Sequence, residues 1–305
     1  MGLAGCCLAW QLSFRGADFT WTDDDRPGAA SRVAAGLVNP VTGKNFNPSW
    51  RLAEFLAEAE MFYGRVGHEL GARLWHPLPV WRLFGEREWA KLGGKLEAAV
   101  PWIASIEEAP GWSAAVVLKG GGRVATREFC EGTRRFFASA ERAGRDARTA
   151  VLCEGAAGLV DGRLGPHRCA KGEILTLRAP GWREDRIRVG GGGWLVPLGG
   201  GLFKAGSTYV WDRLDGAPTA EGRARVEEMI RLLGGEEFEV VSHEAGVRPI
   251  VRQSRPLVGP LDDGRIVFNG LGSKGSLYAP GTAARLADWL LDGVALDPEL
   301  DLRMR

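Results

Sequence analysis

The chain has 305 residues, of which 45% are hydrophobic and 25% are charged. This balance is that of a globular protein with a sizeable core, and it excludes a disordered chain, a collagen and a coiled coil. The 39 basic and 38 acidic residues give a formal charge of +1, so no overall field draws the protein to nucleic acid or to an anionic membrane. At roughly 100–200 residues per domain, the length predicts two domains, or one domain with a large addition.

The numbers of glycines and cysteines further limit the class of protein. The 44 glycines are about twice the usual share of ~7%, and their clustering indicates tight turns and close approaches of the backbone to another group. The five cysteines form no C-x-x-C pair and no zinc pattern, which fits a reduced, cytoplasmic protein. The apolar run Leu3–Leu12 is too short to cross a bilayer and lacks the basic flank of a signal peptide. We therefore expect no membrane span.

The N-terminal half alternates predicted helices and strands. Apolar residues at helical spacing predict helices over Gly5–Gly16, Pro48–Leu70, Glu86–Val100 and from an N-cap at Thr126 to Gly144. Alternating or short apolar runs predict strands over Asp18–Asp24, Trp75–Phe84, Ser113–Ala125 and Ala150–Cys153.

The second half is richer in predicted strands. Several β-like segments between Lys171 and Val258 predict an antiparallel sheet, interrupted by one helix that is capped by Thr219 and ends at Leu233. The glycines over 190–193 read as a hairpin tip. The C-terminus then returns to an α/β pattern, with a predicted strand at Arg265–Phe268, a glycine turn, and a helix at Pro280–Leu291.

The first candidate motif lies at the start of the chain. Gly2 and Gly5 open a predicted helix, and an acidic cluster that begins with Asp23 follows about 20 residues later, as in a dinucleotide fingerprint. In such a site the glycines let backbone N–H groups approach a pyrophosphate, and the acid binds a ribose hydroxyl. The first glycine of the fingerprint is absent, and an ordinary amphipathic helix remains the alternative.

The second and third motifs lie near the C-terminus. The segment GLGSKG over 270–275 follows a strand and precedes a helix, so it predicts an anion- or carbonyl-binding turn with Lys274 adding charge, or a plain strand-to-helix turn. The segment GVRP over 246–249 places Arg248 in an apolar, β-like stretch. A buried, unpaired arginine costs several kcal/mol, so Arg248 must meet either a substrate carboxylate or a structural acid.

Other chemistries find no support. The four histidines, His68, His76, His167 and His243, are too dispersed for a local ligand motif, so no metal is expected. Neither a G-x-S-x-G elbow nor a Walker A sequence is present, which argues against serine-hydrolase and P-loop chemistry.

In their order along the chain, several segments resemble the D-amino-acid-oxidase-like superfamily of FAD-dependent oxidoreductases, which includes glycine oxidase, sarcosine oxidase and D-amino-acid dehydrogenase. The segments are GLAGCCLAWQL with TDDD, AASRVAAGLVNPVTGKNF, VLCEGAAG, GEILTL, GGGWLVPLGGGLFKAGSTY, GVRPIVRQSRPLVGP and IVFNGLGSKGSLYAPGTAARLADWLL. Each is weak alone, but their order is specific and covers nearly the whole chain.

The resemblance implies a mixed α/β and α+β fold with two domains. A Rossmann-like FAD-binding domain that lacks its first strand would comprise 1–48, 125–170 and 256–305. A substrate domain with a mixed, largely antiparallel sheet would comprise 49–124 and 171–255.

The resemblance also implies a cofactor site made mostly of small residues. Gly2 and Gly5 match the pyrophosphate glycines and Asp23 the ribose acid, with Asp24 as its alternative. The segment that runs under the flavin in the family is matched by Ser31, Ala34, Ala35, Gly36 and Leu37. The strand end beside the flavin is matched by Gly155 and Ala156. The turn at the pyrimidine edge of the flavin is matched by Gly270, Gly272, Ser273, Lys274 and Gly275.

The implied reaction removes a hydride from a carbon next to an amine and delivers it to flavin N5, after which the imine hydrolyses in water. Arg248 matches the arginine that holds the substrate carboxylate, and Tyr209, on the sheet that walls the site, is assigned a hydrogen-bonding role. The expected partner is a small amine or amino acid, and nucleic acid is not expected.

Two departures from the family pattern keep other hypotheses open. The first strand of the FAD domain is absent from the sequence, which indicates a trimmed start or a degenerate site. Only Arg145–Thr149 stands where relatives insert further strands. The alternatives to an amino-acid oxidase are therefore an oxidase acting on a modified tRNA uridine and a non-catalytic relative that holds no flavin.

Overall fold

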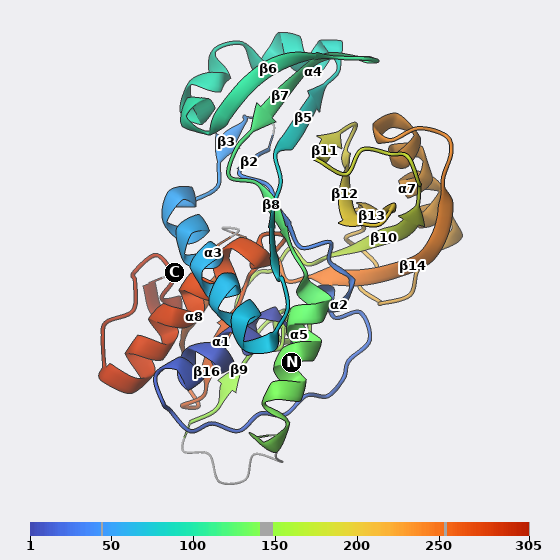
Figure 1. The fold of residues 1–305 in the computed structure, drawn as a ribbon. Coiled ribbons are helices and arrows are strands. Elements are labelled where there is room, and N and C mark those ends of the chain that lie inside the picture. Colours follow the sequence, from blue (N-terminus) through green and yellow to red (C-terminus); the bar gives the residue numbers. More distant parts are fainter. Residues whose placement is uncertain (44, 141–148, 253–254, 305) are drawn as a thin grey trace.

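The computed structural model describes residues 1–43, 45–140, 149–252 and 255–304 (Figure 1). Its largest feature is an eight-stranded sheet. In spatial order the strands are β14 (Glu239–Arg248), β10 (Ala170–Arg178), β13 (Leu202–Gly206), β12 (Gly193–Gly199), β11 (Ile187–Gly190), β5 (Val80–Phe84), β7 (Trp112–Leu118) and β6 (Ile103–Ala109). Only β11 and β5 pair in parallel within this sheet, so the predicted mixed, largely antiparallel sheet is confirmed.

A second, smaller sheet carries the α/β part of the fold. Strand β16 (Ile266–Asn269) lies between β15 (Leu257–Pro260), its antiparallel neighbour, and β9 (Val151–Leu152), its parallel neighbour. The carboxyl ends of parallel strands meet at one edge of a sheet. The turns that follow β9 and β16 are therefore brought to the same edge.

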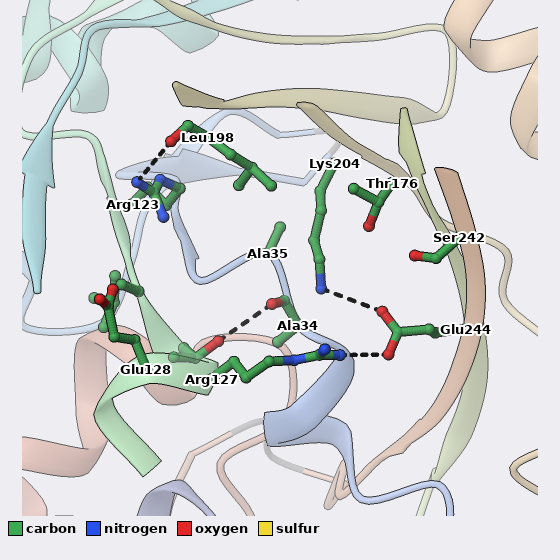
Figure 2. Close-up of a pocket in the computed structure, with 13 residues that line it drawn as sticks. Ala34, Ala35, Arg123, Arg127, Glu128, Thr176, Leu198, Lys204, Ser242 and Glu244 are labelled. Carbon is green, nitrogen blue, oxygen red and sulfur yellow. Dashed lines mark hydrogen bonds and ion pairs between the residues drawn. The ribbon is translucent and has the colours of Figure 1, made fainter. Parts of the chain in front are cut away.

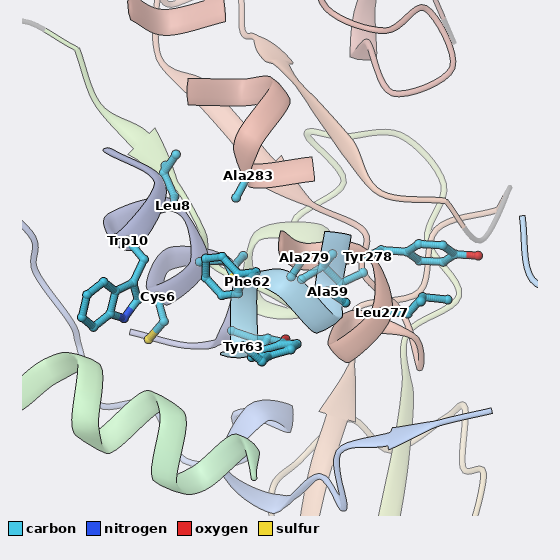
Figure 3. Close-up of a cluster of buried hydrophobic side chains, with 14 of the residues drawn as sticks. Cys6, Leu8, Trp10, Ala59, Phe62, Tyr63, Leu277, Tyr278, Ala279 and Ala283 are labelled. Carbon is cyan, nitrogen blue, oxygen red and sulfur yellow. The ribbon is translucent and has the colours of Figure 1, made fainter. Parts of the chain in front are cut away.

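Helices pack around this small sheet to form the main hydrophobic core. The core joins α1 (Leu3–Phe14), α3 (Leu52–Leu70), α5 (Thr126–Phe136) and α8 (Gly275–Asp292), which come from four distant parts of the chain. Figure 3 shows Leu8, Trp10, Phe62 and Ala283 together in this cluster. The Trp10 indole N–H donates to Thr133 Oγ1 at 2.8 Å, which satisfies the polar atom of a side chain that is otherwise sealed from water.

The N-terminal ends of α1 and α8 lie against each other. A Cβ placed on Gly275 would come within 2.9 Å of Leu3 Cδ2, so glycine is needed at the first residue of α8 for this approach. Further along the same helix pair, the Gln11 side-chain amide donates to the Pro280 carbonyl at 3.4 Å. The first residues of the chain and the C-terminal glycine turn are thus one structural unit.

A third sheet consists of three short strands. Strand β8 (Gly122–Val124) pairs antiparallel with β1 (Leu37–Val38) and with β4 (Trp75–Pro77), while β2 (Val41–Thr42) and β3 (Asn47–Pro48) form a separate hairpin. Around these strands lie the remaining helical elements, namely α2 (Ala30–Val33), α4 (Glu86–Leu92), α6 (Ala157–Val160), α7 (Ala220–Leu233) and the 3₁₀ turns Gly93–Trp102, Ala138–Ala140 and Leu302–Met304.

Several predicted helices and turns are confirmed. Helix α7 begins where expected, because Thr219 Oγ1 accepts a hydrogen bond from the Gly222 N–H at 3.0 Å. The glycines over 190–193 form the tip of the β11–β12 hairpin, and Gly191 and Gly192 have positive φ angles there. The helix expected to end at Gly144 ends at Phe136 as α5, with Phe137 as its C-cap and a 3₁₀ turn over Ala138–Ala140, while 141–144 of the predicted range lie outside the described residues.

Other predictions were wrong in detail. Residues 18–24 form no strand; the Trp21 N–H instead donates to the Ala140 carbonyl at 3.0 Å. Helix α8 begins at Gly275 rather than Pro280, so the proline lies inside the helix, where its ring leaves the Ser276 carbonyl without the usual donor. The expected strand Trp75–Phe84 is two strands, β4 and β5, in different sheets. Strand β6 was not predicted.

Candidate functional site

Arg248, the last residue of β14, is a largely buried cation that has no acidic partner among the described residues. Its Nη2 donates to Ser207 Oγ at 2.5 Å and to the Thr208 carbonyl at 3.2 Å, which are neutral acceptors. The Tyr209 ring lies over the guanidinium, with its centroid 4.1 Å from Cζ. Burial lowers the pKa of Arg248, and Tyr209 offsets part of that effect. A guanidinium in this setting can accept an anion as a further partner.

The neighbouring strand β10 leaves space for the Arg248 side chain. Gly172 on β10 faces Gly246 across the ladder, and a Cβ on Gly172 would lie 2.0 Å from Arg248 Nη2. The guanidinium therefore occupies the space that any side chain at 172 would fill. Tyr209 itself is about half exposed and stacks near Trp211, so an aromatic pair borders the arginine on the solvent side.

The glycine turn after β16 docks directly beside Arg248. The Gly272 N–H donates to the Pro249 carbonyl at 3.0 Å, and both Gly270 and Gly272 have positive φ angles. Lys274, at the end of this turn, is buried enough for desolvation to lower its pKa, and its ammonium donates to Thr42 Oγ1 at 2.9 Å. The site thus holds two largely buried cations, Arg248 and Lys274, whose hydrogen-bond partners are neutral.

One buried amide, Asn269, joins the two turns that the small sheet brings together. Its Nδ2 donates to the Gly155 carbonyl at 2.9 Å, and its Oδ1 accepts from the Gly270 N–H at 2.8 Å. Gly155 has a positive φ angle at the end of β9, as Gly270 does at the end of β16. Asn269 was not singled out from the sequence, although it directly precedes the GLGSKG turn.

Three side chains hold the end of α2 and the start of the Ala34–Leu37 segment. Arg127 Nη2 donates to the Arg32 carbonyl at 3.1 Å, Lys204 Nζ to the Val33 carbonyl at 2.5 Å, and Thr126 Oγ1 to the Ala34 carbonyl at 3.2 Å. Three consecutive carbonyls are therefore fixed by donors from α5 and β13. Thr126 was predicted as the N-cap of α5, but Ala125 occupies that position and the threonine serves this segment instead.

Gly36 in this segment is required by a protein contact. It has a φ angle of +69°, and a Cβ there would lie 1.8 Å from the Val124 carbonyl on β8. Ala34 and Ala35 line a groove on the side of the segment that faces Lys204 (Figure 2). Small residues at these positions thus serve the packing of the segment as well as any ligand.

The predicted pyrophosphate end is also assembled. Gly2 is the N-cap of α1, and the Leu3 N–H donates to Ser31 Oγ at 3.0 Å, so the serine lies at the start of the helix. Asp23 is beside it, ion-paired with Arg134 and 3.7 Å from Arg32 Nη2. Burial raises the pKa of Asp23, but its hydrogen bond to the Met1 amino group and the Arg134 charge bring that pKa below the usual value.

Two predicted residues stand apart from these contacts. Asp24 is exposed and its ion-pair partner is Arg26, so Asp23 rather than Asp24 lies at the start of α1. Ser273 is exposed on the glycine turn. Among the described residues, no group of three or more metal-ligating side chains is gathered, and no helix is both long and apolar enough to cross a bilayer.

Comparison with known proteins agrees with this arrangement. The DAO family model, described as FAD dependent oxidoreductase, matches residues 138–289. The fold is similar to glycine oxidase from Bacillus cereus, with a TM-score of 0.82 at 18% identity over 98% of this chain and 95% of the other. It is also similar to iminodiacetate oxidase from Chelativorans sp. BNC1, with a TM-score of 0.77 at 19% identity over 95% of this chain and 94% of the other.

The chain belongs to the D-amino-acid-oxidase-like superfamily of FAD-dependent oxidoreductases. Two curated relatives carry the name tRNA 5-methylaminomethyl-2-thiouridine biosynthesis bifunctional protein MnmC. The protein from Caulobacter vibrioides is 29% identical over 95% of this chain and 53% of its own length, and that from Methylibium petroleiphilum is 26% identical over 99% and 58%. The chain thus spans little more than half of these relatives.

The described residues fit the family's FAD at its flavin end. The family is FAD-dependent. Asn269 joins the turns at Gly155 and Gly270, and Lys274 ends the second turn. The largely buried Lys274 ammonium has no acidic partner among the described residues, so it can meet a carbonyl or an anionic ring edge. At the adenosine end, a ribose hydroxyl would share Asp23 with Arg134 and Arg32.

Proposed function

We propose that this protein oxidises the C–N bond of an amino acid or an N-substituted glycine. The observation that carries the proposal is Arg248, a buried guanidinium with neutral hydrogen-bond partners, next to the glycine turn at which the flavin end of the cofactor would lie. An amino-acid carboxylate supplies the missing anion, and the planar guanidinium can bind both of its oxygens.

When bound, FAD supplies the acceptor for the hydride that leaves the carbon next to the amine. Arg248 would fix the carboxylate, so that the substrate keeps one orientation relative to the glycine turn. Such positioning accounts for much of an enzyme's rate enhancement, and it needs no acid or base if the amine binds neutral. The imine product would then hydrolyse in water to a carbonyl compound and an amine.

Tyr209 has a different proposed role from the one expected from the sequence. Its ring covers the Arg248 guanidinium at 4.1 Å and is about half exposed. A ring in that position shields the ion pair between arginine and carboxylate from water and thereby strengthens it. We include Tyr209 in the substrate site for this reason.

A test compares two substrates that differ in the carboxylate alone. For sarcosine, Arg248→Ala is expected to raise KM roughly 10- to 100-fold, because a hydrogen-bonded ion pair is lost. For dimethylamine, the same variant is expected to leave KM unchanged. Arg252→Ala, which removes an exposed arginine of the same segment, is the matched control. An unchanged KM for sarcosine in Arg248→Ala removes this arginine from the site.

A second candidate is oxidation of an amine on a modified tRNA uridine. It is favoured by the two relatives named for tRNA modification, and the half-exposed Tyr209 and Trp211 offer stacking surfaces beside Arg248. Assays with free N-substituted glycines and with tRNA that carries such a group on a uridine distinguish the two. If the purified protein is colourless and does not bind added FAD, both candidates fail and a non-catalytic role remains.

A further inference from the structure

A groove of about 310 Å³ lies against the Ala34–Leu37 segment, and Arg248 is not among the residues that line it. Along β14, Glu244 lines this groove, Gly246 packs under α2, and Arg248 reaches the proposed substrate site. Helix α2 and the segment that follows it therefore separate the groove from that site. Figure 2 shows the groove between the start of α5, the segment, and the strands that carry Lys204 and Glu244.

The groove is lined by three cationic side chains. Lys204 and Arg127 share the carboxylate of Glu244, with Lys204 Nζ 3.7 Å from one of its oxygens and Arg127 paired with the other. The third cation, Arg123, comes from β8 on the opposite wall. Two of the cations therefore share one acid. Glu128 also lines the groove, so its three cations exceed its two acids by one charge.

Arg123 is the residue that points to a ligand. Its side chain lines the groove although the residue is only 9% exposed, and its Nε has no hydrogen-bond partner among the described residues. Among the described residues, the guanidinium has one hydrogen-bond acceptor, the Leu198 carbonyl, which lies at a long 3.4 Å from Nη2. Burial lowers the pKa of Arg123, and the charge of Glu128 offsets part of this effect. A buried donor of this kind is costly without a partner.

Neutral donors complete the lining. The hydroxyl-bearing side chains of Thr176 and Ser242 face the groove from β10 and β14, as Figure 2 shows. The first residues of α5 also line it, and Ala125, the N-cap, supplies no side-chain acceptor to the helix start. Hydroxyl donors, a helix N-terminus and a guanidinium are the groups that bind oxyanions.

We infer that this groove, which we call the Arg123 groove, is a binding site for a small oxyanion of the carboxylate or phosphate type, separate from the site at Arg248. The oxyanion would accept hydrogen bonds from the Arg123 guanidinium on one wall and lie near Lys204 on the other. Because the groove shares Ala34 and Ala35 with the cofactor-facing segment, its occupant would contact the back of that segment.

The experiment measures binding of inorganic phosphate and of acetate to the FAD-loaded protein by titration calorimetry, at constant ionic strength held with chloride. FAD loading keeps the probes from the pyrophosphate site. We expect saturable binding of at least one probe, and affinity at least tenfold lower in Arg123→Gln. Preference for one probe over the other identifies whether the ligand is of the phosphate or the carboxylate type.

Two control variants locate the binding. Arg248→Gln is expected to leave the affinity of the groove unchanged, whereas binding that disappears in this variant belongs to the substrate site and overturns the inference. Arg82→Gln removes another largely buried arginine, on the far part of the large sheet, and is also expected to leave the affinity unchanged.

A second variant covers the case in which Arg123→Gln does not fold. Arg123→Lys keeps the charge but loses the planar fork, and an affinity reduced severalfold is expected. The absence of saturable binding of both probes to the folded wild-type protein overturns the inference, as does equal affinity of the wild type and a folded Arg123 variant.

Discussion

Lys204 should make the stability of this protein depend on pH in a specific way. The residue is 8% exposed and its ammonium donates to the Val33 carbonyl at 2.5 Å, while burial lowers its pKa to about 8 despite the charge of Glu244. In the unfolded chain a lysine has a pKa of about 10.4. Between these two values the unfolded state binds more protons than the folded state, so the free energy of unfolding rises with pH.

The size of this effect follows from the two pKa values. Below pH 8 the buried charge costs the folded state about 3 kcal/mol, and the cost disappears as the pH rises through the unfolded value. Between pH 7 and pH 9.5, the free energy of unfolding of the wild type should therefore rise by about 2 kcal/mol relative to that of Lys204→Met. All other titrating groups cancel in this difference.

Urea denaturation of both proteins at the two pH values, in a buffer without phosphate or carboxylate, measures the difference directly. Lys119→Met, which removes an exposed lysine, is the control and is expected to show no such change. A wild-type minus Lys204→Met difference that stays constant from pH 7 to pH 9.5 would refute the reasoning, because it would mean that Lys204 is not desolvated in the folded protein.

Three further substitutions test the contacts around the site. Gly36→Ala should destabilise the fold by about 2 kcal/mol or more in thermal or urea unfolding, because its Cβ would meet the Val124 carbonyl at 1.8 Å and its φ angle is positive. Asn269→Leu should cost about 2–4 kcal/mol and lower the FAD content of the purified protein, since two buried hydrogen bonds are lost, and an unchanged flavin absorbance would contradict this. Gly172→Ala should raise KM for sarcosine roughly tenfold or more by displacing Arg248, with KM for dimethylamine as the internal control.

Local features of this fold were predicted well from the sequence. Thr219 was identified as a helix cap because a hydroxyl residue directly precedes an amphipathic run, and the structure places its oxygen on the Gly222 N–H. The glycine turn over 270–275 was recognised because its strand and helix are neighbours in the chain. The hydrogen bond between Gly272 and Pro249 places this turn beside Arg248.

Features that depend on distant partners were not predictable. The residues of the Arg123 groove come from β8, α5, β10, β12, β13 and β14, and no spacing along the chain links Arg123 to Lys204. The start of α8 was placed too late because Pro280 resembles a first-turn residue, whereas packing of Gly275 against Leu3 extends the helix backwards. Residues 18–24 show strand-like alternation, yet a strand needs a neighbouring strand, and Trp21 bonds to the turn after α5 instead.

The contact between α1 and α8 has a consequence for how the protein is made. Gln11 and Pro280 touch although 269 positions separate them in the chain. During translation Leu3, at the start of α1, emerges from the ribosome 272 residues before Gly275, against which it packs. Native contacts of such long range also slow folding after release. Until α8 has been made, the side of α1 that α8 covers in the folded protein stays exposed, and exposed apolar surface of this kind is prone to aggregation.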